Sequence, residues 1–294
     1  MPTVKEYTTA NKPTWCPGCG NFGMWEALKR AFSELEMEFH DYSIVWGIGC
    51  HGNGADFTKT AGFHALHGRA LPVATALSLA RPDVKVIVEM GDGDGYGLGM
   101  GHFVHSVRRN IDMTCIAHNN QIYGLTTGQA SPTTEHLMKT VSTPDGVLEE
   151  PVNPIGLALA QGASFVARGF AGDIPHLAEL FKKAITHSGF ALVDVFQPCV
   201  TFNRLNTFSW FRERVYKLEE TAHDVTDRTA AFDLSLTTFH EMTCAPDECR
   251  VPIGIYYLDE ELPTYNEGVD AAAEPGWRQA EEPRDISKVM ASLG

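Results

Sequence analysis

Four cysteines of this 294-residue chain have spacings that could serve a metal site. Cys16 and Cys19 form a C-x-x-C loop, Cys50 closes the apolar segment GIGC, and Cys199 follows another apolar segment in QPC. Four thiolates suit either a structural zinc ion or an iron–sulfur cluster. The spacing leaves both possibilities open, and it leaves open that the four are buried thiols without a ligand.

The other three cysteines show no comparable pattern. Cys115 stands among apolar residues of a predicted strand, and we expect a core thiol there. Cys244 and Cys249 lie in an acidic C-terminal segment, and we interpret them as incidental. An odd number of cysteines in a chain of this size does not indicate a disulfide scaffold.

A second group of residues could bind a diphosphate together with a divalent cation. The sequence GDGD at 91–94 directly follows an apolar predicted strand, and the pair NN at 119–120 closes the next one. Glycines let a diphosphate approach the backbone, and the helix that follows offers its N-terminus to the anion. Magnesium prefers oxygen ligands, which Asp92 and Asn120 would supply from the carboxyl ends of neighbouring parallel strands.

This spacing resembles the thiamine-diphosphate motif, a GDG followed by an NN pair just under thirty residues later. The motif implies that Asp92, the Asn120 side chain and the backbone carbonyl of Ile122 hold Mg²⁺ against the diphosphate. The alternative is a glycine-rich turn and an unrelated asparagine pair, but the order strand, helix, strand and NN favours the cofactor. A dinucleotide site is not indicated, because the glycines of residues 95–101 do not fit G-x-G-x-x-G.

The elements that must position these residues alternate between strands and helices. Apolar runs predict strands at 43–49, 84–90, 113–119 and 190–196, and helical composition or spacing predicts helices at 71–80, 102–110 and 175–188. Because the strands are apolar throughout and alternate with helices, the fold class is α/β, with a parallel sheet covered by helices on both faces.

Charge divides the chain at about residue 218. The whole chain has 23 Lys and Arg against 37 Asp and Glu, for a net charge of −14. Residues 1–218 hold 20 acids and 18 bases, whereas residues 219–294 hold 17 acids and 5 bases. The periodic apolar pattern also fades after residue 218. We therefore predict a cofactor-binding domain over 1–218 and an irregular acidic C-terminal arm over 219–294.

Composition argues against several classes of protein. Apolar residues make up 44% and charged residues 20%, as in an ordinary globular protein. An acidic chain without a Lys/Arg-rich tract is not expected to bind nucleic acid. No apolar run approaches the ~18 residues of a membrane span, and the first residues lack the apolar stretch of a signal peptide. We therefore expect a cytoplasmic protein that does not enter a membrane.

Together these features resemble the β subunit of the 2-oxoacid:ferredoxin oxidoreductases. The matching segments are collinear and lie within residues 12–218. They are WCPGCGNFG (15–23), GIGCHG (47–52), HALHGRALPVATAL (64–77), VIVEMGDGDGYGLGMGHFVHSVRRNIDMT (86–114), HNNQIYGLTTGQASPTT (118–134) and QPCVTFN (197–203). A thiamine motif and four such cysteines rarely coincide otherwise, so the joint pattern is specific.

The resemblance implies two cofactor sites beside the magnesium ion. Cys16, Cys19, Cys50 and Cys199 would ligate one [4Fe–4S] cluster close to the thiamine diphosphate. Contacts to the thiamine cofactor are implied for Ile48, Gly49, Cys50, His51, His67, Gly93, Asp94, Gly124 and Leu125. The fold of residues 1–218 would then be a thiamine-diphosphate-binding fold.

The implied reaction is oxidative decarboxylation of a 2-oxoacid with coenzyme A, giving an acyl-CoA and CO₂. Electrons would pass through the cluster to ferredoxin, and the reaction can also run as a carboxylation. Because ferredoxins are usually acidic, we expect ferredoxin to dock away from residues 219–294 and the arm to pack on a partner subunit. Activating the thiamine needs a Glu on a separate pyrimidine-binding domain, and this chain has room for only one such α/β domain. We therefore expect the Glu on an α subunit, in an (αβ)₂ assembly.

Two departures from the family pattern concern the substrate. Some relatives have Lys where this chain has Thr127, and many have Ser where it has His51. The resemblance favours 2-oxoglutarate, and pyruvate or a branched-chain 2-oxoacid are the alternatives. Two other functions stay open at this point. One is the diphosphate-binding half of another thiamine enzyme with a structural zinc site, and the other is a non-catalytic interaction protein stabilised by zinc.

Overall fold

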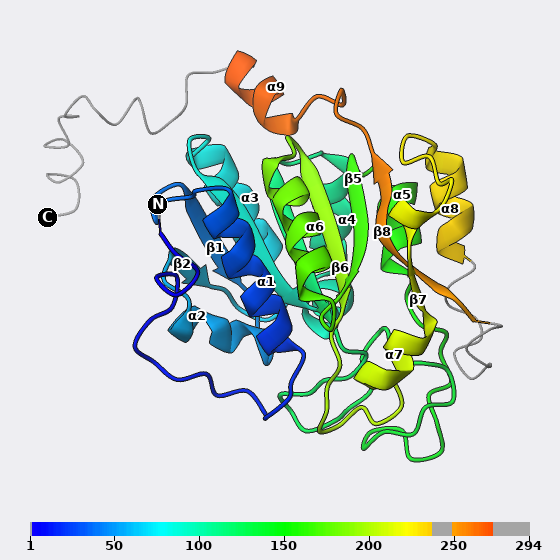
Figure 1. Ribbon diagram of the computed structural model, residues 1–294. Coiled ribbons are helices and arrows are strands. Elements are labelled where there is room, and N and C mark those ends of the chain that lie inside the picture. Colours follow the sequence, from blue (N-terminus) through cyan, green and yellow to red (C-terminus); the bar gives the residue numbers. More distant parts are fainter. Residues whose placement is uncertain (1, 237–248, 273–294) are drawn as a thin grey trace, which may run out of the picture.

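The computed structural model describes residues 2–236 and 249–272, and Figure 1 shows how their helices and strands are arranged. The strands are β1 (Tyr42–Trp46), β2 (Ala61–His64), β3 (Lys85–Gly91), β4 (Met113–Asn119), β5 (Phe165–Phe170), β6 (Phe190–Phe196), β7 (Val215–Lys217) and β8 (Val251–Leu258). The helices are α1 (Asn21–Glu34), α2 (Gly54–Phe57), α3 (Ala70–Ala80), α4 (Met100–Arg108), α5 (Pro154–Ala160), α6 (Ile174–Thr186), α7 (Phe208–Arg214), α8 (Arg228–Leu236) and α9 (Tyr265–Ala272).

Within these residues the strands form one eight-stranded sheet in the order β2-β1-β3-β4-β6-β5-β8-β7. Neighbouring strands run parallel, except that β5 and β8 are antiparallel. The predicted α/β fold with a parallel sheet is therefore confirmed. Because β1, β3, β4 and β6 are adjacent and parallel, their carboxyl ends meet at one edge of the sheet, which is where such folds bind ligands.

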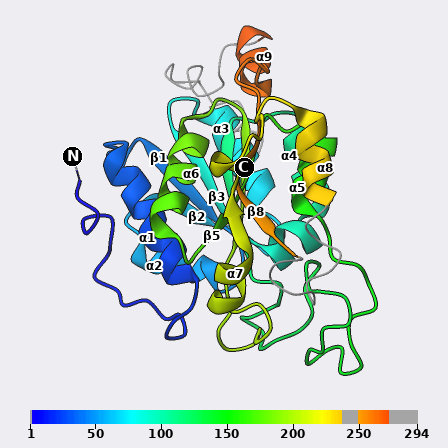
Figure 2. The same ribbon diagram turned by 45° about the vertical axis from the view of Figure 1, so that its right-hand side comes forward.

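Helices cover both faces of the sheet, and Figure 2 shows α1 and α6 on one side with α4, α5 and α8 on the other. Successive side chains of β3 point to opposite faces of the sheet. Ile87 packs in the apolar cluster with α1 and α6, and Val88 packs in the cluster with α3, α4 and α5. No helix among the described residues is long and apolar enough to cross a membrane.

The apolar pattern predicted the centre of the sheet better than its margins. Strands β1, β3, β4 and β6 and helices α3, α4 and α6 lie over the predicted segments, with ends shifted by a few residues. Strands β2, β5 and β8 were not predicted. All four residues of β2 are exposed, β5 contains a buried arginine, and β8 contains Pro252 and Gly254, so none has the uninterrupted apolar run of a buried strand.

The acidic segment 219–294 has regular structure where it is described. It contributes α8, β8 and α9, and β8 pairs with β5 and is buried except at its last residue. This part of the predicted arm therefore belongs to the main sheet. Residues 237–248 and 273–294 lie outside the described residues, and the division of the chain at residue 218 stays a prediction.

Candidate functional site

A pocket at the carboxyl edge of the sheet brings the predicted thiamine and magnesium residues together. Residues 47–51 follow β1, Asp92 follows β3, and Asn120 follows β4. All twelve of the predicted residues line this one pocket. They are Ile48, Gly49, Cys50, His51, His67, Asp92, Gly93, Asp94, Asn120, Ile122, Gly124 and Leu125.

The turn after β3 leaves no room for a side chain at Gly93. Asp92 precedes a π-helical turn, η2 (Gly93–Leu98), a wide form of helix that often occurs at functional sites. A Cβ at Gly93 would lie 2.1 Å from the ring of Tyr123, whose hydroxyl donates to the Gly93 carbonyl at 3.2 Å. Only glycine fits here, so the backbone itself can lie against a bound diphosphate.

The Asp92 carboxylate is buried and held by two hydroxyl groups. Its Oδ2 accepts hydrogen bonds from Ser131 Oγ at 2.5 Å and from Thr133 Oγ1 at 2.7 Å. Burial raises the pKa of Asp92 to about 6, and these hydroxyl donors only partly oppose that rise. A buried carboxylate is costly unless it is paired with a positive charge. The residues therefore fit a bound divalent cation at this position.

The Asn120 side chain is fixed in its orientation. Its Oδ1 accepts the Ile122 N–H at 3.1 Å, and its Nδ2 donates to Gln197 Oε1 at 3.0 Å. Asn203 Nδ2 donates to the Asn120 backbone carbonyl at 3.1 Å. Two buried side chains, Gln197 and Asn203, thus hold the predicted magnesium ligand Asn120 in place.

Two histidines of the pocket have different surroundings. His67 Nδ1 lies 2.9 Å from Asp94 Oδ1, which also accepts the Gly68 N–H at 2.6 Å. His51 is 3% exposed, and its Nε2 has no hydrogen-bond partner among the described residues. Burial lowers the pKa of His51 well below its usual range, so the ring is neutral. A buried ring nitrogen without a protein partner fits a site that a polar cofactor completes.

The four predicted cluster ligands converge beside the same pocket. A Cβ at Gly124 would lie 3.5 Å from Cys199 Sγ and 3.6 Å from Cys50 Sγ. Burial, together with the charges of the Cys199, Cys50 and Cys16 thiols, raises the pKa of Cys19 to about 12. These four cysteines form no disulfide. One loop, which carries Cys16 and Cys19, and the ends of β1 and β6 therefore bring the four thiols into one region.

The four thiols could hold either of two kinds of metal group. A single zinc ion holds its sulfur ligands at about 2.3 Å. Among residues 2–236 and 249–272, no three His, Cys, Asp or Glu side chains lie close enough together to hold one metal ion. Four thiols that lie in one region and influence one another's pKa can hold either a zinc ion or an iron–sulfur cluster.

Several residues of the site had no assigned role in the sequence. Ser131 and Thr133 hold Asp92, Asn203 holds Asn120, and Gln197 contacts both Asn120 and Cys19. All of them stand in the two segments 118–134 and 197–203 that resemble the family, and that resemblance is the only feature of the sequence that could have pointed to them.

The remaining cysteines differ from one another. Cys115 is fully buried in β4 with its Sγ 3.5 Å from Met90 Sδ, as expected for a core thiol. Cys249 is disulfide-bonded, so its interpretation as incidental missed a covalent role. Cys244 lies outside the described residues.

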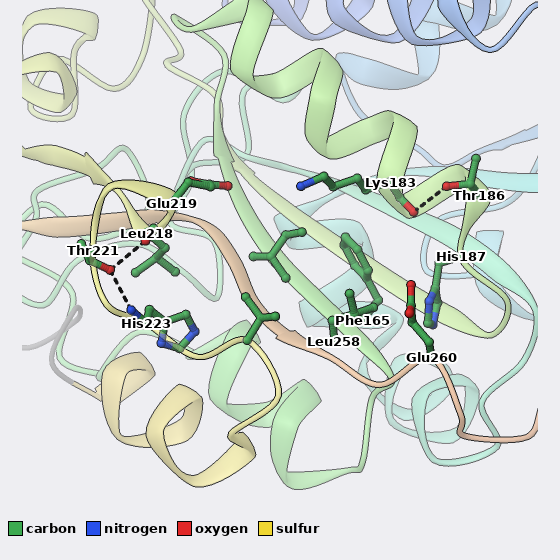
Figure 3. Close-up of a pocket in the computed structure, with 12 residues that line it drawn as sticks. Phe165, Lys183, Thr186, His187, Leu218, Glu219, Thr221, His223, Leu258 and Glu260 are labelled. Atoms are coloured by element: carbon green, nitrogen blue, oxygen red, sulfur yellow. Dashed lines mark hydrogen bonds between the residues drawn. The ribbon is translucent and has the colours of Figure 1, made fainter.

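A second pocket, of about 390 Å³, lies between α6, the segment 218–225 and the end of β8, and Figure 3 shows it. Lys183 and Glu219 stand on opposite walls above an apolar floor that includes Phe165. The hydrogen bonds drawn there are local, such as those that the Thr221 hydroxyl makes within its own turn. None of the predicted site residues lines this pocket, so the carboxyl edge remains the candidate site.

Comparison with known families agrees with this geometry. Residues 47–195 match the family described as thiamine pyrophosphate enzyme, C-terminal TPP binding domain. Residues 199–274 match the family described as the C-terminal part of the pyruvate ferredoxin oxidoreductase beta subunit. Residues 47–195 thus belong to a thiamine-diphosphate-binding domain, and the carboxyl-edge pocket is its candidate cofactor site.

Individual relatives define the family more closely. The 2-oxoacid:ferredoxin oxidoreductase subunit beta of Saccharolobus solfataricus is 44% identical over 261 residues, which cover 87% of this chain and 85% of that protein. The 2-oxoglutarate oxidoreductase subunit KorB of Mycobacterium tuberculosis is 43% identical over 199 residues, 68% of this chain and 53% of that protein. The chain belongs to the family of 2-oxoacid:ferredoxin oxidoreductase β subunits.

A solved structure extends the similarity over the whole fold. It is a 2-oxoglutarate:ferredoxin oxidoreductase from Magnetococcus marinus with 2-oxoglutarate, coenzyme A and succinyl-CoA bound. The alignment has a TM-score of 0.86 and 38% identity, and it covers 100% of this chain and 96% of that chain.

Proposed function

We propose that this chain carries thiamine diphosphate, Mg²⁺ and one [4Fe–4S] cluster and, with an α subunit, converts 2-oxoglutarate and coenzyme A to succinyl-CoA and CO₂. Ferredoxin would accept the electrons, and the reaction could also run as a carboxylation. The observation that carries the proposal is the position of Cys50, which lines the thiamine pocket and also belongs to the converging cysteines. Electrons would therefore have a short path from one site to the other.

The roles of the protein's own residues follow from their contacts. When bound, thiamine diphosphate supplies the nucleophile and the electron sink for decarboxylation, and the cluster takes electrons one at a time. Asp92, Asn120 and the Ile122 carbonyl would hold Mg²⁺, and the glycine turn would receive the diphosphate. His51, neutral and unpartnered at Nε2, would offer this nitrogen to a polar atom of the cofactor.

Exposed apolar side chains, on segments that also carry pocket residues, support an α subunit that covers the pocket. Phe63, Leu66, Leu98 and Leu125 are between 50% and 78% exposed. Gly68, which follows Leu66 closely in the sequence, packs against Leu98, so the segments that carry these two leucines are adjacent. An apolar patch of this kind indicates a protein interface. The activating Glu would then reach the cofactor from the covering subunit, as expected for an (αβ)₂ assembly.

The choice of 2-oxoglutarate rests on the similar enzymes whose names specify it. No Lys or Arg is among the residues that line the described pocket, so a cation for the distal carboxylate of 2-oxoglutarate would come from the α subunit. The co-expressed complex should turn over 2-oxoglutarate faster than pyruvate or a branched-chain 2-oxoacid. The β chain alone should decarboxylate none of them. Preference for another 2-oxoacid would overturn the substrate assignment, and activity of the isolated chain would overturn the role of the partner.

Metal analysis tests the cluster. The complex purified without oxygen should contain about four iron and four sulfide per β chain. C199S should lose them, whereas C115A, a change at a core thiol that is not one of the four predicted ligands, should keep them. Stoichiometric zinc without sulfide would show that the four cysteines form a structural zinc site instead.

A further inference from the structure

Gln197 lies between the predicted magnesium ligand Asn120 and the predicted cluster ligand Cys19. It directly follows β6 and is 1% exposed. Its Oε1 accepts a hydrogen bond from Asn120 Nδ2 at 3.0 Å, and its Nε2 donates toward Cys19 Sγ at 3.4 Å. One carboxamide therefore touches a ligand of each cofactor site.

Backbone groups fix the direction of this series of hydrogen bonds. The Ile122 N–H, which can only donate, bonds to Asn120 Oδ1 at 3.1 Å, so Asn120 turns its Nδ2 toward Gln197. The Pro198 carbonyl, which can only accept, receives Gln197 Nε2 at 3.1 Å. Rotating either amide by half a turn would place two donors or two acceptors against each other. The N–H group of Gln197 is therefore the end that faces Cys19.

Close packing keeps the carboxamide in this place. A Cβ at Gly20 would lie 2.9 Å from Gln197 Nε2 and 3.0 Å from its Cγ. The Gly20 N–H also donates to the Pro198 carbonyl at 3.1 Å. A larger residue at position 20 would push Gln197 away from Cys19, so the glycine next to this cysteine preserves the contact.

We propose, building on the function proposed above, that Gln197 is a positioning residue that raises the reduction potential of the cluster and fixes the magnesium ligand. Reduction adds negative charge to the cluster and its thiolates, and an N–H donor to Cys19 stabilises that charge. Gln197 Oε1 accepts the hydrogen bond from Asn120 Nδ2 and so leaves Asn120 Oδ1 as the end that can face the metal. A single side chain thus tunes the electron acceptor and supports the thiamine site.

Two substitutions separate these two effects. Q197M removes all three side-chain hydrogen bonds with a side chain of similar length. Q197E keeps an acceptor for Asn120 and replaces the amide group that donates to Cys19 and to the Pro198 carbonyl with a carboxylate oxygen. We expect a lower midpoint potential in both variants, measured by redox titration of the αβ complex with detection by electron paramagnetic resonance. The Mg²⁺-dependent affinity for thiamine diphosphate should fall about fivefold in Q197M and change less than about twofold in Q197E.

A matched control uses Gln161, which follows α5 at the opposite edge of the sheet, and Q161M should leave both quantities unchanged. An unaltered potential in Q197E with its iron and sulfide intact would overturn the role toward the cluster. An unaltered thiamine diphosphate affinity in Q197M would overturn the role toward Asn120, and this measurement needs no cluster. Absence of iron and sulfide from the wild-type complex would instead overturn the proposed function itself.

Discussion

Asp92 and Asp94 are two residues apart and both buried, but their hydrogen-bond partners give them different tasks. Asp94 Oδ1 accepts a backbone N–H from Gly68 and lies beside the ring of His67. Asp92 Oδ2 is held by two hydroxyl groups, which carry no charge to balance it. Burial therefore raises the pKa of Asp92 to about 6, and a bound cation would remove this cost. Burial raises the pKa of Asp94 as well, but its oxygen already has the Gly68 N–H and the His67 ring as partners, so the local chemistry supports Asp92 as the proposed metal ligand.

Replacing Asp92 should consequently weaken cofactor binding without unfolding the protein. D92A should lower the Mg²⁺-dependent affinity for thiamine diphosphate by at least about 100-fold, because it removes a direct ligand. T133V removes only one hydroxyl that orients Asp92 and should cost about tenfold. Isothermal titration of the complex with thiamine diphosphate and Mg²⁺ measures both. D83A, at an exposed carboxylate paired with Arg81, is the control, and equal losses in D83A and D92A would contradict the assignment.

At this scale the sequence pointed to the candidate ligands but not to the residues that hold them in place. Asp92, Asn120 and the four cysteines were recognisable because their chemistry and spacing are specific. Ser131, Thr133 and Gln197 are ordinary polar residues, and only the folded chain brings them beside a ligand. A buried hydrogen-bond partner far away in the sequence leaves no periodic pattern to find.

Strand β5 shows the same limit at the scale of elements. It lies inside the sheet between β6 and β8, but its sequence FVARGF places a charge where a buried strand should be apolar. Arg168 is completely buried, and its Nε lies 3.2 Å from Asp194 Oδ2 on β6. Tyr96 and Asn119 also donate to Asp194. The pairing partner that makes an arginine acceptable in β5 comes from another strand, so the pattern within β5 could not predict the element.

Removing the arginine should destabilise this part of the sheet. R168L would leave the buried carboxylate of Asp194 without its cation, and burial already raises the pKa of that group. We expect a loss of about 3–5 kcal/mol in the free energy of unfolding, measured by urea denaturation. The control R81L breaks an exposed pair with Asp83 and should cost less than about 1 kcal/mol. Similar losses in the two variants would show that the buried ion pair contributes no more to the free energy of unfolding than an exposed one.

At the scale of the whole molecule, the described acidic segment and the cysteines lie at opposite edges of the sheet. The described residues 219–236 and 249–272 hold 10 acids and 2 bases, so most of the acidity of the predicted arm belongs to this part of the sequence. The Asp259 N–H donates at 2.8 Å to the carbonyl of Ser164, which precedes β5, so this acidic turn lies at the amino ends of the parallel strands. Cys16 is exposed at the carboxyl edge.

This separation of charge supports ferredoxin docking at the cysteine edge. Lys12 precedes Cys16 and Arg204 follows Cys199, and both side chains are exposed. The loops that carry them are adjacent, since a Cβ at Gly18 would touch Val200. An acidic ferredoxin would be attracted to these cations and repelled by the acidic edge on the other side of the molecule. The sequence shows how charge is divided along the chain. Only the fold, which places the acidic segment and the cysteines at opposite edges, allows a docking site to be predicted from it.

Charge reversal at each edge tests this docking direction. The double variant K12E/R204E should raise the KM for ferredoxin about fivefold or more at low salt, and the difference should shrink as salt screens the charges. Turnover with a small neutral electron acceptor should stay as in the wild type, because these exposed residues touch neither cofactor site. E260K/E261K also reverses two charges, in the opposite sense and at the amino edge. It should leave the KM for ferredoxin within about twofold. A large fall in KM for E260K/E261K, with no effect of K12E/R204E, would place ferredoxin at the acidic edge instead.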